Sequence, residues 1–160
     1  MDVIFVVPLV VSLLVLRYYL ADHDTPIDKD RKRFTDGIAL FEAGDYTKAH
    51  AYFDQKIKDN RKSALAYAYR GKCNLQAENF YSALYDFAEA LSFESNLPDI
   101  HFERGKVHYQ LDEYQEAYLA FDKAVWFSRG SHAEAMQWRT KVYRLLHPEK
   151  VIEIGLTQNM

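Results

Sequence analysis

Histidine and cysteine are the side chains of this sequence that could ligate a metal or carry acid–base and nucleophilic chemistry. The 160-residue chain contains six histidines and a single cysteine, Cys73. His101 and His108 are seven residues apart, so on a helix they share a face but are separated by ~10 Å along the axis. That separation is too long for one metal ion, and Cys73 has no partner thiol. We therefore interpret these residues as surface or packing side chains.

A second possible ligand cluster, Asp22, His23 and Asp24, lies in a polar stretch with a Thr-Pro step. No further ligand is placed near it, and the stretch is typical of a linker, which we assign to residues 21–29. The sequence shows no phosphate-binding glycine loop, paired-carboxylate site or nucleophile motif. It therefore predicts no catalytic residue, no metal site, no cofactor and no small-molecule substrate. We expect the chain not to be an enzyme.

Composition and charge exclude two further classes. The net charge is −3 and the pI about 6.1, so the chain lacks the basic character of a nucleic-acid-binding protein. A single cysteine rules out an internal disulfide bond and fits a reducing compartment. Glycine (6) and proline (4) are scarce, which favours helix over sheet.

The first twenty residues differ from the rest of the chain. Residues 3–16 are apolar except for Ser12, and Arg17 and two tyrosines follow. As a helix, residues 3–20 would be ~27 Å long, close to the ~30 Å hydrocarbon core of a bilayer. A secretory signal peptide is the main alternative, but Asp2 and the poor cleavage site argue against it. The sequence predicts a transmembrane anchor over residues 1–20.

Basic residues follow this segment, whereas Asp2 precedes it. Because positive flanks remain on the cytoplasmic side, we expect a single-pass membrane protein with the body of the chain facing the cytoplasm. The flanking basic residues are Arg17, Lys29, Arg31, Lys32 and Arg33.

Beyond the linker the chain repeats itself three times at a spacing of 34 residues. Each copy contains a glycine, an alanine twelve residues later and a phenylalanine four residues after that. An aromatic residue precedes each alanine by three positions, and these offsets of three and four are helical. The repeated positions are Gly37, Gly71 and Gly105; Tyr46, Phe80 and Tyr114; Ala49, Ala83 and Ala117; Phe53, Phe87 and Phe121; Lys56, Ala90 and Ala124.

Each copy is predicted to be two antiparallel helices joined by a tight turn. Glycine in the first helix and alanine in the second fit where the two helices cross closely. One such pair cannot bury its apolar face alone, so the copies must stack. A last helix follows, and Ser131 and Glu134 have the spacing of a capping box at its start. This helix stops before Pro148 and is expected to cover the final pair.

The pattern resembles the tetratricopeptide repeat family, whose unit has 34 residues and whose small and aromatic positions match those above. The resemblance covers about residues 30–131, and the first copy matches least well because Lys56 replaces a small residue. It implies an all-α fold: an α-solenoid of three helix pairs plus a C-terminal capping helix, preceded by the transmembrane helix. The tetratricopeptide domain is assigned to 30–147, divided into 30–63, 64–97, 98–131 and 132–147, with a tail at 148–160.

The resemblance also implies a binding groove lined by the first helix of each pair. In this chain the matching positions give an apolar, aromatic trough that contains two lysines. The alternative is that neighbouring helices cover part of the trough. The predicted groove residues are Phe34, Ile38, Phe41, Leu65, Lys72, Leu75, Phe102, Lys106, Tyr109 and Tyr143.

Family members that bind the acidic tails of cytosolic heat-shock chaperones carry Lys, Asn, Asn, Lys and Arg at five groove positions. This sequence has none of these residues there, and two of its five residues are acidic. We therefore expect that it does not bind such tails. The five matching positions are Phe34, Ile38, Tyr69, Asp99 and Glu103.

Two functions follow as hypotheses. The first is a membrane-tethered adaptor or assembly scaffold whose groove binds a partner protein, through an apolar segment with at least one acidic residue. The acidic residue is inferred from Lys72 and Lys106, which occupy the same position in successive copies. The second is a permanent accessory subunit of a larger membrane complex. The sequence does not identify the partner, the organism, the membrane, the oligomeric state or the role of the tail.

Overall fold

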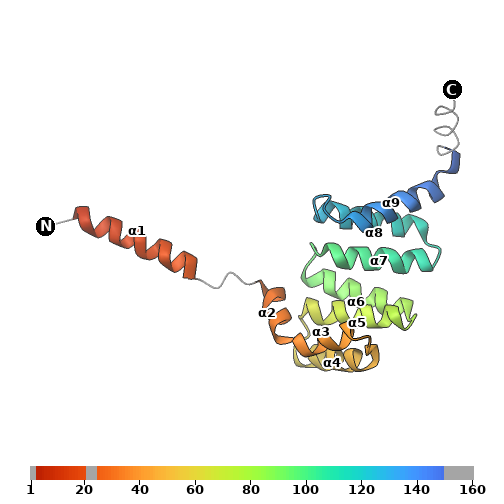
Figure 1. Ribbon diagram of the computed structural model, residues 1–160, viewed down its shortest axis with the longest axis horizontal. Coiled ribbons are helices and arrows are strands. Elements are labelled where there is room, and N and C mark those ends of the chain that lie inside the picture. Colours follow the sequence, from red (N-terminus) through yellow and green to blue (C-terminus); the bar gives the residue numbers. More distant parts are fainter. Residues whose placement is uncertain (1–2, 21–24, 150–160) are drawn as a thin grey trace.

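The computed structural model describes residues 3–20 and 25–149, and within them the chain forms nine α-helices and no strand. Figure 1 shows α1 apart from a body in which the other helices stack in chain order. The helices are α1 (Val3–Leu20), α2 (Pro26–Arg33), α3 (Thr35–Glu42), α4 (Tyr46–Asp59), α5 (Ala64–Gln76), α6 (Phe80–Phe93), α7 (Pro98–Gln110), α8 (Tyr114–Phe127) and α9 (Ala133–Leu146).

The structure corrects the expectation of a membrane span. Among the described residues, no helix combines the length and the apolar character that crossing a bilayer requires. The predicted transmembrane anchor at 1–20 is therefore wrong, as is the single-pass, cytoplasm-facing localisation that depended on it.

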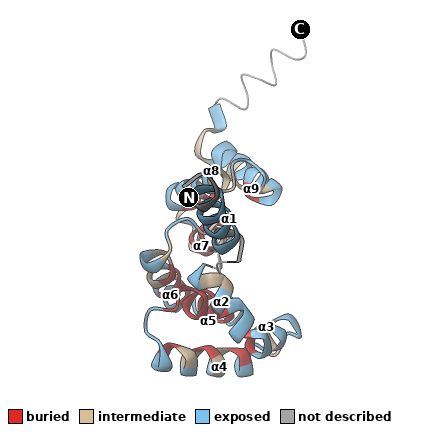
Figure 2. Cartoon of the chain, turned by 90° about the vertical axis from the view of Figure 1, so that its left-hand side faces the viewer, coloured by how far each residue is buried: buried red, intermediate tan, exposed pale blue. Residues whose placement is uncertain are grey.

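The repeated helix pairs stack as the sequence predicts. Helices α3 and α4, α5 and α6, and α7 and α8 form the three pairs, and α9 packs on α8. Figure 2 shows that the buried residues concentrate in the middle of this stack, in particular on α5 and α6. The fold is an all-α helical solenoid with a final helix that covers the last pair.

The first pair departs from the expected boundaries. Its first helix is divided into α2 and α3 at Phe34, and α2 begins at Pro26, within the range assigned to a linker. Thr25 caps α2: its hydroxyl accepts the backbone N–H of Asp28, whose carboxylate accepts the N–H of Thr25. Residues 21–24 of the expected linker lie outside the described residues, as does the tail at 148–160 beyond Glu149.

A buried polar contact holds α2 against the second pair. The Ser63 hydroxyl donates to the Asp30 carboxylate at 2.5 Å, and both side chains are buried. The same hydroxyl accepts the backbone N–H of Ala66 and so caps α5. The carboxylate also lies near the positive end of the α5 dipole, which favours its negative charge.

The repeated glycines lie where the two helices of a pair cross. A Cβ atom on Gly71 would lie 2.7 Å from the Phe87 ring, and one on Gly105 would lie 2.6 Å from the Phe121 ring. Both rings are fully buried. Because real Cβ atoms essentially never approach other atoms this closely, only glycine fits without movement of the ring.

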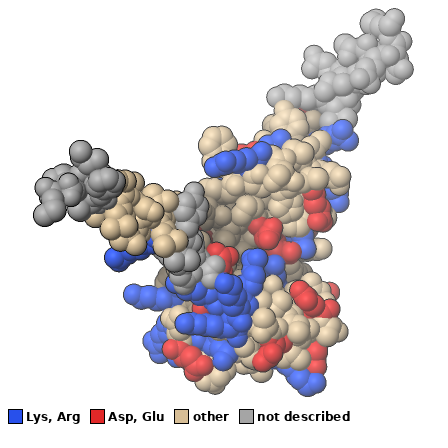
Figure 3. All heavy atoms as spheres, turned by 60° about the vertical axis from the view of Figure 1, so that its left-hand side comes forward, with Lys and Arg blue, Asp and Glu red and all other residues tan. Residues whose placement is uncertain are grey.

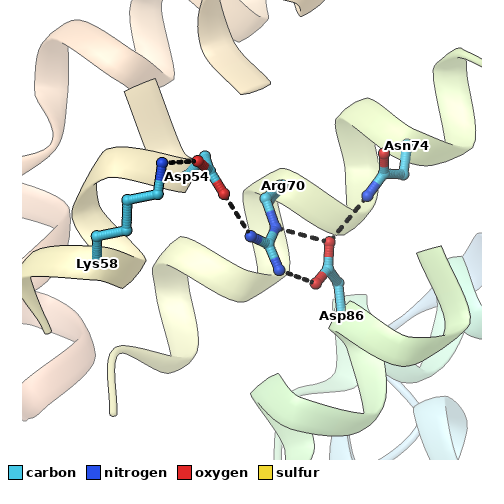
Figure 4. A network of polar contacts seen from close by, with 5 residues as sticks. All are labelled: Asp54, Lys58, Arg70, Asn74 and Asp86. Carbon is cyan, nitrogen blue, oxygen red and sulfur yellow. Dashed lines mark hydrogen bonds and ion pairs between the residues drawn. The ribbon is translucent and has the colours of Figure 1, made fainter. Parts of the chain in front are cut away.

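A polar network joins the first two pairs (Figure 4). Arg70 donates two hydrogen bonds to Asp86, at 2.6 and 3.1 Å, and one to Asp54 of the preceding pair, at 2.7 Å. Asn74 donates to Asp86 at 2.9 Å, and Lys58 forms an ion pair with Asp54 at 2.7 Å. The hydrogen bonds to Asp86 raise the pKa of Arg70. Asp86 is 1% exposed, so its charge depends on these partners.

Similar ion pairs occur at only some of the junctions between pairs. Asp122 of α8 contacts Arg139 of α9 at 2.9 Å, as Asp54 contacts Arg70. At the junction of the second and third pairs, the residue matching Asp54 and Asp122 is Ala88, which is exposed. The buried apolar residues form two clusters, one around Phe53 and Phe87 and one around Phe121 and Val142, and the division between them falls within α7.

The start of α9 differs from the prediction. His132, not Ser131, is the N-cap, and its Nδ1 accepts the backbone N–H of Ala135 at 3.2 Å. The Ser131 hydroxyl instead donates to the Ser128 carbonyl at 2.8 Å. The predicted capping box of Ser131 and Glu134 is therefore wrong, although the helix that it introduces is present.

The imidazole of His101 is buried at the start of α7. Its Nε2 donates to the carbonyl of Ser95 at 2.9 Å, and its ring stacks on Phe127 at 5.2 Å. Its Nδ1 is buried and has no hydrogen-bond partner among the described residues. Burial lowers the pKa of His101, and the hydrogen bond to Ser95 opposes this effect.

Replacing Gly71 by alanine tests the close crossing. Overpacking against the Phe87 ring costs about 1–3 kcal/mol, while alanine gains about 1 kcal/mol of helix propensity over glycine. We expect Gly71→Ala to lower the free energy of unfolding by up to about 2 kcal/mol in denaturant titration. The control is Ala88→Gly on the exposed face of α6, which measures the difference in helix propensity alone. If Gly71→Ala stabilises the fold, the helices do not cross as closely at Gly71 as described.

The buried imidazole predicts a pH dependence of stability. Because the folded-state pKa of His101 lies below its ordinary value of 6.5, the unfolded chain takes up the proton first as the pH falls. The stability associated with this residue is thus present above about pH 6.5 and is lost below it. His101→Gln keeps a donor for Ser95 and removes the titration. The loss of melting temperature between about pH 7.5 and pH 5.5 should be smaller in this variant, and an unchanged loss would refute the assignment.

Candidate protein-interaction site

Three of the predicted groove residues belong to the core instead. Phe34, Leu65 and Phe102 are only 5–6% exposed. Phe34 makes edge contacts with the rings of Tyr52 and Phe53. Neighbouring helices therefore cover the apolar floor of the groove, which is the alternative that the sequence left open.

The other predicted residues retain partial exposure. Ile38, Phe41, Leu75, Lys72, Lys106 and Tyr109 are half-buried. Tyr143 is 36% exposed, and its ring contacts those of Tyr118 and His147. Phe41 makes an edge contact with Tyr69 across α3 and α5. The structure thus brings one row of these side chains together along the first helices of the pairs.

Several lysine side chains in this row lie over aromatic rings. Lys72 Nζ lies 5.2 Å from the centre of the Tyr69 ring, and Lys106 Nζ lies 5.3 Å from that of Phe102. Lys141 Nζ lies 4.6 Å from the Tyr109 ring and 4.4 Å from a second ring, that of Trp138. Such positions hold each ammonium group by cation–π attraction. We call the surface that carries these groups the first-helix face; it comprises Arg31, Tyr69, Lys72, Leu75, Gln76, Asp99, Lys106, Tyr109, Gln110, Trp138 and Lys141.

The first-helix face contains two hollows. The larger, of about 480 Å³, lies between α5, α7 and α9, and we call it the tryptophan hollow. It combines apolar walls with amide side chains, one lysine and one glutamate, a mixture that suits a peptide. Its lining residues are Leu75, Gln76, Glu78, Phe80, Lys106, Gln110 and Trp138.

The smaller hollow, of about 90 Å³, lies between α2, α5 and α7, and we call it the arginine hollow. Its floor is apolar, and two cations and one carboxylate stand around it. Its lining residues are Ile27, Arg31, Leu65, Ala68, Tyr69, Lys72, Leu97, Pro98, Asp99 and Ile100.

Charge is distributed unevenly around these hollows. Figure 3 shows Lys and Arg side chains gathered over the region of α2, with acidic side chains beside them. The exposed basic residues of α2 include Arg31 and Arg33. Glu103 forms an ion pair with Lys106 at 2.7 Å, whereas Asp99, with 79% of its side chain exposed, lies 3.7 Å from His132. Burial raises the pKa of Tyr69, which Arg31 partly opposes.

Some residues of this face were not predicted. Trp138 and Lys141 come from α9 and reach Tyr109 of α7. Their spacing of three places them on one helix face, a signal that was present in the sequence. Tyr69 was considered only as a position that lacks a chaperone-binding residue, but it stacks on Phe53 and supports Lys72.

The residues first considered for chemistry stay apart in the fold. Cys73 is buried, and burial raises the pKa of its thiol to about 11. His108 Nδ1 lies 2.7 Å from the Glu113 carboxylate, and Arg104 donates to its Nε2 at 3.4 Å. Among the described residues, no group of three His, Cys, Asp or Glu side chains could hold a metal ion. The absence of an enzymatic activity stays a prediction.

Comparison with known proteins supports the repeat assignment. Residues 34–96 match the family model of the tetratricopeptide repeat. The sequence matches none of the curated proteins with which it was compared.

Solved structures share the fold at low sequence identity. The first tetratricopeptide repeat domain of Spaghetti (RPAP3), bound to the HSP90 peptide SRMEEVD, is 17% identical and superposes with a TM-score of 0.66, covering 70% of this chain and 88% of that one. The Arabidopsis OM64 domain is 20% identical, with a TM-score of 0.66 and coverage of 74% and 97%. The Yersinia enterocolitica secretion chaperone SycD, in complex with a peptide of the translocator YopD, is 16% identical, with a TM-score of 0.62 and coverage of 83% and 99%.

These comparisons support the tetratricopeptide repeat fold predicted from the sequence. They give no support to a membrane-anchored member of the family. Two of the three similar structures hold a peptide, so the fold is one on which peptides are bound.

Titration with the peptide SRMEEVD tests the expectation that this chain does not bind acidic chaperone tails. At the five positions discussed above, Phe34 is buried, Asp99 carries negative charge on the first-helix face, and Glu103 carries negative charge one turn further along α7. These carboxylates would repel the acidic peptide. We expect no saturable change in fluorescence polarisation when labelled SRMEEVD is titrated with the chain. Saturable binding that weakens as salt is added would contradict this expectation.

Proposed function

We propose that this chain is a protein-interaction module that binds a peptide segment of a partner protein along the first-helix face. One observation supports this proposal most directly. Lys72 and Lys106 occupy the same position in successive repeats, and each borders one of the two hollows of that face. The repeat thus places a cation beside an apolar hollow twice in succession.

The expected partner segment is apolar with acidic residues. The apolar part fits Leu75, Phe80 and Trp138 in the tryptophan hollow. The acidic part fits Lys106, whose ammonium group is already positioned by a ring below it and by Glu103. A partner carboxylate would share this ammonium group with Glu103, so the ion pair contributes more to orientation than to affinity.

The affinity of such a face is expected to be modest. Much of its apolar surface is already buried within the chain, which leaves a few anchor positions for a partner. Ordering the peptide and losing its translational freedom offset much of the gain from those anchors. A dissociation constant of about 1 μM corresponds to about −8 kcal/mol and is reasonable for one face of this size.

A second candidate function, a permanent subunit of a larger complex, is favoured by the outer helices. Tyr81 and Tyr85 of α6 are 74% and 59% exposed, and Leu119 and Trp126 of α8 are 52% and 78% exposed. Aromatic residues are enriched at the centre of protein interfaces. A contact through these residues would use the opposite helices of each pair and would leave the first-helix face open.

A charge-reversal variant separates the two candidates. Lys106→Glu with Gln110→Glu places two negative charges at the tryptophan hollow. Since each tenfold change in affinity is 1.4 kcal/mol, the loss of one ion pair and the added repulsion should weaken a partner bound there by ~10-fold or more. The measurement is quantitative mass spectrometry of the proteins that co-purify with the tagged full chain.

The matched control changes the same residue types on an outer helix. Gln115→Glu with Lys123→Glu alters two exposed residues of α8 by the same total charge. Partners lost with the α7 variant and kept with the α8 variant support the first-helix face, provided that both variants keep their helical content and melting temperature. Partners kept with the α7 variant and lost with the α8 variant would support the permanent-subunit function instead.

A further inference from the structure

The arginine hollow has features that the proposed function does not yet use. It is enclosed mainly by apolar side chains, of which Leu65, Ala68 and Ile100 are buried. Its volume of about 90 Å³ exceeds the ~30 Å³ that one water molecule occupies in the liquid. It is far smaller than the tryptophan hollow, and its apolar floor suits one aliphatic side chain.

Two cations, Arg31 and Lys72, line this hollow. No carboxylate among the described residues lies within 4.0 Å of the Arg31 guanidinium or of Lys72 Nζ. Lys72 is held over the Tyr69 ring, while Arg31 lies on the exposed side of α2. The two cations come from different helices, so they can hold one carboxylate from two sides.

The third charged group at the hollow narrows the choice of ligand. Asp99 lies at the start of α7, and Glu103 follows one turn later on the same helix. A ligand with several neighbouring acidic residues would therefore meet attraction on the α2 and α5 side and repulsion on the α7 side. A ligand with one carboxylate avoids the repulsion.

We propose that the arginine hollow binds an aliphatic side chain of the partner segment, while Arg31 and Lys72 hold the carboxylate of an Asp or Glu next to it. This inference rests on the proposed function and specifies one position within it. The acidic residue is internal to the partner segment, because the first-helix face continues from the arginine hollow to the tryptophan hollow.

Blocked dipeptides test the proposal without a known partner. The probes are acetyl-Leu-Asp-amide, acetyl-Leu-Asn-amide without the charge, and acetyl-Gly-Asp-amide without the side chain. Each is titrated into the ¹⁵N-labelled full chain, and backbone amide shifts are followed at Tyr69, Lys72 and Ile100. The first probe should bind at least ~3-fold more tightly than either of the others, as expected when an exposed ion pair or a small apolar contact is removed.

Two variants locate the binding. Arg31→Gln with Lys72→Gln should reduce the affinity for acetyl-Leu-Asp-amide to that for acetyl-Leu-Asn-amide. Lys62→Gln with Lys123→Gln removes the same charge elsewhere and should leave the affinity unchanged. Ala68→Leu fills the hollow and should remove the preference for acetyl-Leu-Asp-amide over acetyl-Gly-Asp-amide. If this variant does not fold, the comparison of the two probes on the unchanged chain still shows whether the leucine side chain contributes.

Specific outcomes would overturn the proposal. They are equal affinity for the three probes, shifts confined to residues away from the hollow, or tighter binding of N-acetyl-leucine, whose carboxylate is terminal. If any of these outcomes occurs while the Lys106→Glu, Gln110→Glu variant loses partners, the proposed ligand of the arginine hollow is rejected and the proposed function is kept. Dipeptide binding at the hollow with no loss of partners in that variant would reject the proposed role of the tryptophan hollow instead.

Discussion

The close approach of a glycine backbone to a phenylalanine ring sets the geometry of this molecule. At Gly71 and Gly105 there is no room for a Cβ atom. This close contact fixes the distance between the two helices of a pair and the face that each helix turns toward the other. The residue after each glycine is a lysine, Lys72 or Lys106. Since consecutive residues on a helix differ by about 100° in direction, the crossing that buries the glycine turns the lysine away from the partner helix. The packing constraint and the cationic row thus have the same origin.

Buried polar contacts add uniqueness to this packing. Asp30 with Ser63, and Arg70 with Asp86 and Asn74, can be satisfied only when successive helices are in one register. Such groups contribute little net stability over apolar residues of the same size, but leaving one unpaired is costly. They penalise arrangements in which similar repeats slide past one another, which is a hazard for a chain made of repeated units.

The sequence predicted the repeats well because 34-residue spacing and helical offsets are local patterns. It did not predict which apolar groove residues would be free: Phe34 and Phe102 match groove positions, yet adjacent helices cover them, and burial depends on packing that no local pattern encodes. Trp138 was missed because the last helix lies outside the repeat on which the site was inferred. The membrane span was predicted from apolar composition and length, but among the described residues no helix is long and apolar enough to cross a bilayer. His132 replaced the expected cap since imidazole Nδ1 can also accept an N–H, a role seldom considered for histidine.

The uneven junctions between repeats have a mechanical meaning. A linear array behaves as a row of units coupled to nearest neighbours, and it separates first where the coupling is weakest. Here the coupling is weakest next to α7: Ala88 replaces an ion-pairing aspartate between α6 and α7, and the apolar core divides within α7. Both hollows are lined by residues of α5 and α7, so each bridges this boundary. A peptide segment bound in these hollows would couple the repeats on the two sides of the boundary, so that they fold and unfold cooperatively.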